Sequence, residues 1–284
     1  MNELQLAATL KPIEQISNGE TRQCDDQLSI EEPLEIQIAF TKGGEKQSDS
    51  LSVTMRTPGD DIDLVVGFLY TEGIIQSMDQ IAAIKPTGEL SGQYDLQNTL
   101  LVELAPGHQF DLKRFQRYFY TNSSCGVCGR NSLQALELMH TPSLDARSPK
   151  IAVQLLKSLP KSLQKQQNQF RKTGGIHAAA LFSADGDLID LKEDVGRHNA
   201  VDKLIGARLQ RDGLPVRDVL LMVSGRVGFE LVQKALMADI GFMAAIGAPT
   251  SLAVELAEEH NMTLVGFLKE TSFNVYAGKE RIVH

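Results

Sequence analysis

The residues with the clearest chemical potential are the two cysteines in Ser124-Cys125-Gly126-Val127-Cys128-Gly129. The CxxC spacing brings the two sulfurs within reach of each other, and the glycines leave the backbone free to expose them. A structural zinc site needs a second ligand pair, and the chain offers only Cys24 and scattered histidines. A thioredoxin-like pair should open the first helix of a βαβ unit, whereas this one falls between predicted helices. We therefore favour a nucleophilic thiol on a loop over an inert structural cysteine.

Positive charge around these cysteines favours the thiolate, which is the form of cysteine that attacks. Residues 111–172 carry 11 Lys and Arg against 3 acids, a net charge of +8 in a chain of net charge -8. Arg130 and the positive end of a helix predicted to begin at Asn131 act in the same direction. The basic block has two interpretations, a solvated helical surface or a face for an anion or a partner.

Two further segments place polar residues where a predicted strand meets a turn. In Gly174-Gly175-Ile176-His177-Ala178-Ala179, a zinc deaminase would have Glu in place of Ala179, so deaminase chemistry is disfavoured. In Glu193-Asp194-Val195-Gly196-Arg197-His198, a glycine turn leads into a predicted helix. Asp194 could simply cap this turn, with His198 satisfied at the helix start. Alternatively, Arg197 and His198 face a ligand at the strand-to-helix edge of a sheet.

A fourth segment, Ser224-Gly225-Arg226-Val227-Gly228, follows an apolar run and precedes a predicted helix. Backbone N–H groups at a helix start, together with the guanidinium of Arg226, suit a phosphate. Two glycines and one Arg fall short of a P-loop or a dinucleotide fingerprint. The segment therefore indicates an anion contact without identifying the anion.

Hydrophobic patterning predicts the elements that position these residues. Alternation at 34–40 and 51–55, a helix capped by Asp60 or Asp61, and a strand at 99–104 predict an N-terminal α+β unit. After residue 175 we expect a hairpin about 185–186 and then helices and strands in alternation at 199–209, 219–224, 229–238, 240–246, 251–260 and 262–268. Such alternation implies right-handed crossovers and a mostly parallel sheet covered on both faces.

This patterning divides the chain into four parts. We predict a partly ordered leader at 1–30, which shows no steady periodicity, and an N-terminal α+β domain at 31–120. A CxxC loop and helical connector follow at 121–172, and a C-terminal α/β domain at 173–284. The fold class expected is α/β, and α+β overall.

Length and composition exclude several classes of protein. The chain has 284 residues with 42% hydrophobic content, enough for a real core, and no apolar run long enough to cross a membrane. The N-terminal residues do not resemble a secretory signal, and three cysteines do not make a disulfide framework, so we expect a cytoplasmic protein. The acidic balance argues against a nucleic-acid binder.

The four segments, in this order, resemble the formate dehydrogenase accessory sulfurtransferase (FdhD) family. The blocks that carry the resemblance are CGVCG, GGIHAAAL, EDVGRHNAVDKLIG, SGRVGFELVQKA, GAPTSLAVELA and LVGFLKETSFNVYAG, and they cover most of the chain from Glu31 to Ile282. The resemblance implies a homodimer with a cytidine-deaminase-like three-layer α/β/α fold in the C-terminal domain. It also implies a sulfur carrier that takes persulfide sulfur from a cysteine desulfurase and passes it to the molybdenum cofactor of formate dehydrogenase.

The resemblance further implies roles for individual residues. Cys125 would be the persulfide intermediate, and Cys128 a helper or secondary acceptor. The cofactor, molybdenum bis(molybdopterin guanine dinucleotide), is a bound substrate, and no catalytic metal of the protein's own is expected. Its phosphates would lie against Arg197, His198, Arg226 and Lys269. The stretch that matches the family's cofactor segment is Phe267, Leu268, Lys269, Glu270, Thr271 and Ser272.

One departure from the family concerns this last segment, where we would expect GFLRGGR and find GFLKETS. Two guanidinium groups are lost and Glu270 is gained, which bears on cofactor affinity more than on sulfur transfer. Two other functions stay open. One is a non-catalytic carrier of a guanine-containing cofactor, and the other is an inactive deaminase relative that binds a free nucleotide. Cys24 is expected to be a variable leader thiol.

Overall fold

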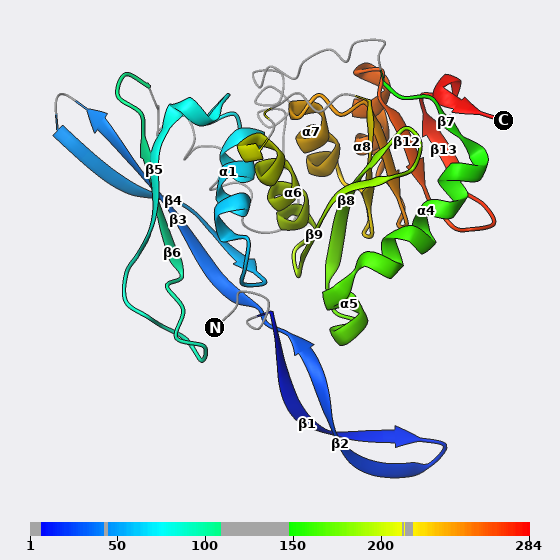
Figure 1. Cartoon of the computed structure of the whole chain (residues 1–284), viewed down its shortest axis with the longest axis horizontal. Helices are drawn as coiled ribbons and strands as arrows, with labels where there is room; N and C mark the ends of the chain where they lie inside the picture. Colours follow the sequence, from blue (N-terminus) through cyan, green and yellow to red (C-terminus); the bar gives the residue numbers. More distant parts are fainter. Residues whose placement is uncertain (1–6, 43–44, 109–147, 212, 214–217) are drawn as a thin grey trace.

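The computed structural model describes residues 7–42, 45–108, 148–211, 213 and 218–284 (Figure 1). The described part is a mixed α/β structure, as the sequence predicted, and it contains six α-helices. None of the described helices combines the length and the apolar character needed to span a membrane. Cys125 and Cys128 lie outside the described residues, and so does the helix predicted at Asn131.

The N-terminal part is a four-stranded sheet covered by one helix. The strand order is β4-β3-β6-β5, in which β3 and β6 are parallel and the other neighbours antiparallel. Helix α1 (Asp61–Thr71) places its buried apolar residues against those of β3, and together they form a hydrophobic core. This is the α+β arrangement that the alternating pattern predicted. The strands are β3 (Glu32–Lys42), β4 (Glu45–Arg56), β5 (Ile81–Thr87) and β6 (Thr99–Leu104), with a short 3-10 helix η2 (Met78–Gln80) before β5.

The C-terminal part is built on a six-stranded sheet in the order β13-β12-β11-β10-β8-β9. Its strands are β8 (His177–Ser183), β9 (Leu188–Asp194), β10 (Val219–Val223), β11 (Phe242–Ala245), β12 (Thr263–Gly266) and β13 (Asn274–Ala277). Only the β10/β11 and β11/β12 pairs are parallel, and the other three are antiparallel. The expectation of a mostly parallel sheet was therefore wrong, because β8 and β9 form a hairpin and β13 returns without a helical crossover.

Helices cover both faces of this sheet, as predicted, in three layers. Helices α6 (Arg197–Arg211), α7 (Phe229–Met237) and α8 (Ser251–Glu259) pack on one face. Helix α4 (Val153–Gln166) packs on the other face, and the short α5 (Asn168–Thr173) follows it (Figure 1). Strands β7 (Ile151–Ala152) and β14 (Ile282–Val283) form a small parallel pair, preceded at β14 by the 3-10 helix η3 (Lys279–Arg281). The likeness to cytidine deaminases stays a prediction.

Residues 8–29 form a hairpin, where the sequence predicted a partly ordered leader without periodicity. Strands β1 (Ala8–Ser17) and β2 (Glu20–Ser29) pair antiparallel along their whole length and project from the rest of the molecule (Figure 1). The connecting Asn18 and Gly19 both have positive φ, 54° and 84°. An Asn-Gly pair is the preferred two-residue hairpin turn, so the signal was present in the sequence and was overlooked.

The two parts meet where α1 crosses α6, and they share α6 between their cores. The first half of α6 packs in the core of the C-terminal sheet, whereas Leu209 near its end is buried in the N-terminal core. At the crossing, a Cβ atom on Gly67 would lie 1.8 Å from the carbonyl oxygen of Asp202. A Cβ atom on Gly206 would lie 1.9 Å from the carbonyl oxygen of Asp63. The helices thus touch through their backbones, which only glycine allows.

Candidate functional site

Three of the four predicted segments meet at one edge of the six-stranded sheet. This edge carries the carboxyl ends of β9, β10, β11 and β12 and the first residue of β8, His177. The side-chain oxygen of Ser224 accepts a hydrogen bond of 2.9 Å from the backbone N–H of Ala178. The N–H of Ser224 in turn donates to the carbonyl oxygen of Ala178 at 3.0 Å. Ligands of open α/β sheets bind outside such an edge, so this is the expected location of a site.

A pocket of about 680 Å³ opens at this edge. It is bounded on one side by α4, through Pro160 and Lys161, and on the other by residues 268–270 after β12. Its remaining wall includes residues 174–177, Ser224 and several apolar side chains. A volume of this order suits a small molecule or one nucleotide-sized part of a larger one.

The loops behind the pocket are held together by backbone contacts between glycines. The N–H of Gly247, after β11, donates to the carbonyl oxygen of Gly225, after β10, at 3.2 Å. The N–H of Phe267, after β12, donates to the carbonyl oxygen of Gly247 at 3.0 Å. A Cβ atom on Gly247 would lie 2.6 Å from the Gly225 oxygen. These glycines are therefore needed for the close approach of the three loops.

His177 is the titratable side chain of the pocket with a perturbed pKa. Burial lowers the pKa of His177 below the ordinary value of 6.5, and the positive charge of Arg197 lowers it further. The negative charge of Asp194 raises the pKa of His177, and the nearby His198 lowers it. Arg197 Cδ and His177 Nδ1 both border Gly225, at 3.5 and 3.3 Å from the position of its missing Cβ. The imidazole is therefore neutral at neutral pH and can both donate and accept a hydrogen bond.

Replacing Arg197 by Met is expected to raise the pKa of His177 toward 6.5, because it removes a neighbouring positive charge. The lowered pKa means that the unfolded chain binds the proton more readily. Stability contributed by neutral His177 is therefore present above pH 6.5 and is lost as the pH falls through 6.5 toward the folded-state pKa. Titration of the imidazole by NMR measures the shift, with Arg226→Met as the matched control. An unchanged His177 pKa in Arg197→Met would contradict this electrostatic coupling.

Three of the four predicted phosphate contacts, Arg197, His198 and Arg226, differ in their surroundings. His198 Nε2 lies 3.0 Å from Glu230 Oε2, and this partner lowers the pKa of the Glu230 carboxyl. Within the described ranges, the buried Nε of Arg197 has no hydrogen-bond partner. The exposed Arg226 makes no side-chain hydrogen bond or ion pair in that same part of the chain. Arg197 and Arg226 are thus the two with guanidinium groups still available to an anion.

The predicted segment 267–272 lies beside the pocket, but its residues are not equivalent. Leu268 is buried in the core beneath α4, whereas Lys269 and Glu270 are exposed and line the pocket. Phe267 is 43% exposed and adopts a positive φ of 52°, an unusual conformation for a bulky residue. Thr271 and Ser272 are exposed, outside the pocket wall. Contact of this segment with a cofactor stays a prediction.

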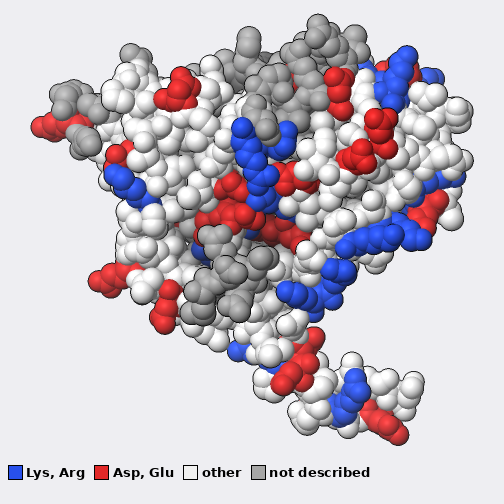
Figure 2. All heavy atoms as spheres, viewed as in Figure 1, with Lys and Arg blue, Asp and Glu red and all other residues white. Residues whose placement is uncertain are grey.

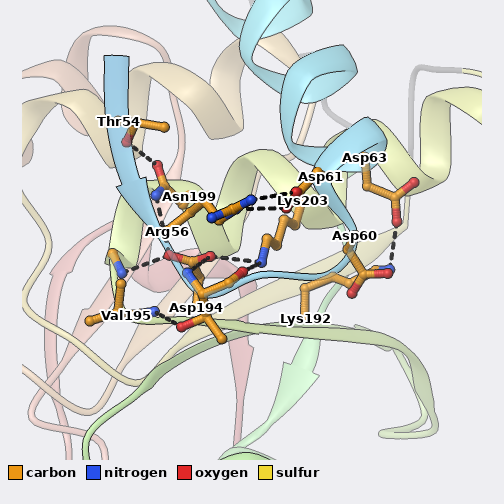
Figure 3. Close-up of polar contacts among 12 residues, drawn as sticks. Thr54, Arg56, Asp60, Asp61, Asp63, Lys192, Asp194, Val195, Asn199 and Lys203 are labelled. Atoms are coloured by element: carbon orange, nitrogen blue, oxygen red, sulfur yellow. Dashed lines mark hydrogen bonds and ion pairs between the residues drawn. The ribbon is translucent and has the colours of Figure 1, made fainter. Parts of the chain in front are cut away.

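Asp194 has a structural role, which confirms and extends its interpretation as a turn cap (Figure 3). Its fully buried carboxylate accepts hydrogen bonds from the N–H groups of Gly196 at 2.8 Å and Thr57 at 3.1 Å. The same carboxylate lies 2.7 Å from Lys203 Nζ, which also donates to the carbonyl oxygen of Thr57 at 2.8 Å. Asn199 donates to the carbonyl oxygen of Met55 at 2.7 Å. Asp194, Asn199 and Lys203 therefore bind the C-terminal part to the end of β4.

A second buried ion cluster lies where α1 meets α7. Lys234 Nζ lies 3.0 Å from both Asp202 Oδ1 and Glu72 Oε1, and it donates to Thr71 Oγ1 at 2.9 Å. These carboxylates raise the pKa of Lys234 despite its burial, so the lysine stays charged. Sequence reasoning missed Asn199, Asp202 and Lys203 as interdomain residues. The available signal was a set of polar residues at core-facing positions of α6.

Comparisons with known proteins agree with the family suggested by the motifs. A family model described as the FdhD/NarQ family matches residues 30–283. A protein from Streptomyces avermitilis named sulfur carrier protein FdhD is 46% identical, with coverage of 94% of this chain and 93% of its own. A protein of the same name from Sulfolobus acidocaldarius is 42% identical, with coverage of 95% and 96%. A crystal structure from Desulfotalea psychrophila, assigned as a formate dehydrogenase accessory protein, has the same fold, with a TM-score of 0.70 at 21% identity over 98% of this chain and 100% of its own.

Proposed function

The chain belongs to the FdhD/NarQ family, and on that premise we propose that it is a sulfur carrier required for formate dehydrogenase activity. It accepts persulfide sulfur from a cysteine desulfurase and transfers it to molybdenum bis(molybdopterin guanine dinucleotide) before this cofactor enters formate dehydrogenase. The match to a relative named a sulfur carrier, over 94% of this chain and 93% of the relative, supports the activity. The observation in the structure that supports it best is the pocket where residues 174–177, Ser224 and residues 268–270 meet.

Cys125 is the sulfur-carrying residue in this proposal. Its thiolate attacks the outer sulfur of the donor's persulfide, so that a new S–S bond forms at Cys125 and the donor cysteine leaves as a thiolate. Once the cofactor is bound, Cys128 acts as the helper; without the cofactor, the persulfide stays on Cys125. The Cys128 thiol attacks the Cys125 side of the persulfide, a Cys125–Cys128 disulfide forms, and the outer sulfur leaves as hydrosulfide. The two cysteines are oxidised by two electrons when the disulfide forms, and the outer sulfur is reduced by the same two electrons. The sulfur therefore reaches the cofactor as hydrosulfide.

The described residues bind the substrate cofactor in this scheme. Lys269 lies in the pocket wall, whereas Arg197 at the start of α6 and Arg226 after β10 lie outside it at the same edge of the sheet. Their positive charge suits phosphate groups. Glu270 in the pocket wall opposes an anion, and the two Arg of the expected pattern GFLRGGR are absent, so we expect weaker binding than that pattern would give. A pocket of about 680 Å³ takes one arm of the cofactor and leaves the metal end outside. A homodimer in the cytoplasm is part of the same proposal.

Mass spectrometry of the protein after incubation with desulfurase and cysteine is expected to show about 32 Da of added mass on Cys125, the mass of one sulfur. Cys128→Ala is the matched control and keeps this adduct, whereas Cys125→Ala loses it. A non-catalytic cofactor carrier makes a different prediction, since it would support formate dehydrogenase maturation with both cysteines replaced. Wild-type labelling of Cys125→Ala, or full maturation by the double variant, would exclude the sulfur-carrier mechanism.

A further inference from the structure

The outer side of α4 carries three lysines in one row. Lys157, Lys161 and Lys165 follow one another at intervals of four residues. With about 3.6 residues per turn, this spacing places them on one side of the helix, opposite its buried leucines. Lys161 and Lys165 are exposed and Lys157 is half-buried. We call these three residues the lysine row.

The lysine row has no acidic neighbours along the chain. Residues 150–173 contain six Lys and Arg and no Asp or Glu, in a chain whose net charge is -8. None of the six forms an ion pair within the described ranges. Figure 2 shows the resulting band of positive charge over α4 and α5. Like charges four residues apart destabilise a helix, so the row does not serve the stability of α4.

The row also borders the candidate site. Lys161 lines the pocket together with Pro160 of the same helix, so the positive band runs past the pocket mouth. From Lys157 to Lys165 the row is about 12 Å long, since each helical residue advances about 1.5 Å. It lies on a convex helix surface, and a convex surface suits a macromolecule better than a small anion. A partner that docked on it would be held beside the pocket.

We propose that the lysine row is the docking surface for a carboxylate-bearing face of the protein that donates sulfur, an inference that rests on the proposed function. The pocket is assigned to the acceptor cofactor, so the donor needs a separate surface within reach of the same mouth. Complementary charge increases the association rate and orients the partner without requiring a large apolar contact. A protein face is favoured over nucleic acid because the band is short and the rest of the chain carries an excess of acids.

Binding of the full-length protein to the cysteine desulfurase of the same organism tests this proposal. The triple variant Lys157→Glu, Lys161→Glu, Lys165→Glu is expected to bind about tenfold more weakly at low salt, with a flatter dependence of Kd on salt. The matched control replaces three exposed lysines elsewhere, Lys11, Lys85 and Lys279, by Glu and changes the net charge equally. The control is expected to bind within about twofold of wild type. A triple Lys→Gln variant removes the charge of the row without reversing it, and it should weaken binding in the same direction if the Glu variant fails to fold.

Several results would overturn the proposal. These are wild-type affinity for the desulfurase in the row variants, an equal loss of affinity in the control variant, or no binding by the wild type. Row variants that lose binding to a short DNA duplex but keep binding to the desulfurase would also overturn it. The experiment measures binding to the desulfurase and does not measure sulfur transfer. A wild type that docks through the row but never acquires the Cys125 persulfide would therefore contradict the proposed function only. A wild type that acquires the persulfide while the row variants dock normally would contradict only this inference.

Discussion

Replacing Gly206 by Ala is expected to lower the free energy of unfolding by about 3 kcal/mol, because the new methyl group has no room at the helix crossing. Its Cβ would lie 1.9 Å from the Asp63 oxygen and 2.6 Å from the backbone nitrogen of Gly67, so α1 and α6 would have to separate. Gly67→Ala should have a similar effect, with its Cβ 1.8 Å from the Asp202 oxygen. Urea denaturation followed by circular dichroism measures both.

The expected destabilisation is opposite in sign to the usual effect of replacing glycine by alanine in a helix. In a helix interior, Gly→Ala ordinarily stabilises by about 1 kcal/mol. Gly175→Ala is the control, since its Cβ would meet only the Thr173 oxygen, at an ordinary 3.8 Å, and we expect a change within about 0.5 kcal/mol. If Gly206→Ala proved as stable as wild type or more so, the backbone contact between α1 and α6 would be wrong.

Replacing Lys203 by Met is expected to cost about 3–5 kcal/mol, because it leaves the Asp194 carboxylate buried without its counter-charge. Asp194 has no exposed surface, and Lys203 is 2% exposed. The variant also removes the hydrogen bond to the Thr57 oxygen, which joins the two parts of the chain. Denaturation with urea at neutral pH gives the free energy of unfolding.

The exposed pair Lys85–Glu103 provides the comparison for this prediction. Its N···O distance of 2.9 Å is close to the 2.7 Å of Lys203–Asp194, but the Lys85 side chain is 57% exposed. Lys85→Met is therefore expected to cost at most about 1 kcal/mol. The double variant Asp194→Asn, Lys203→Met should recover part of the loss, because no net charge is then left buried. Equal losses in Lys203→Met and Lys85→Met would show that Asp194 is not confined as the structure describes.

Much of the secondary structure could be predicted, because a helix or strand that buries one or both faces has a recognisable pattern of apolar residues. The apolar run 219–223 coincides with β10, and the helix predicted at 199–209 lies within α6. Strand direction was harder, because it depends on whether a crossover helix intervenes, and seven residues without one separate β12 from β13. The four-residue β13 was itself missed, since so short a strand shows little periodicity.

The candidate site could be predicted in part. The rule that ligands bind at the carboxyl edge of an α/β sheet was applied to Arg197 and His198, which do not line the pocket. Ser224 of the fourth segment does line it, together with His177 and Lys269. The contribution of α4 could not be foreseen, because a polar helix pattern does not say which face of a sheet the helix covers. The burial of Asp194 was equally hidden, since its partner Thr57 is 137 residues away in the chain.

Helix α6 contributes residues to both hydrophobic cores, and this determines how the molecule unfolds. Leu209 is anchored among the residues of the N-terminal sheet, while Ala200 and Leu204 are anchored in the C-terminal one. Neither lobe can lose its structure without exposing apolar surface of the other to water. We therefore expect the two parts to unfold together, and an N-terminal fragment that ends before α6 would lack Leu209, which is part of its core.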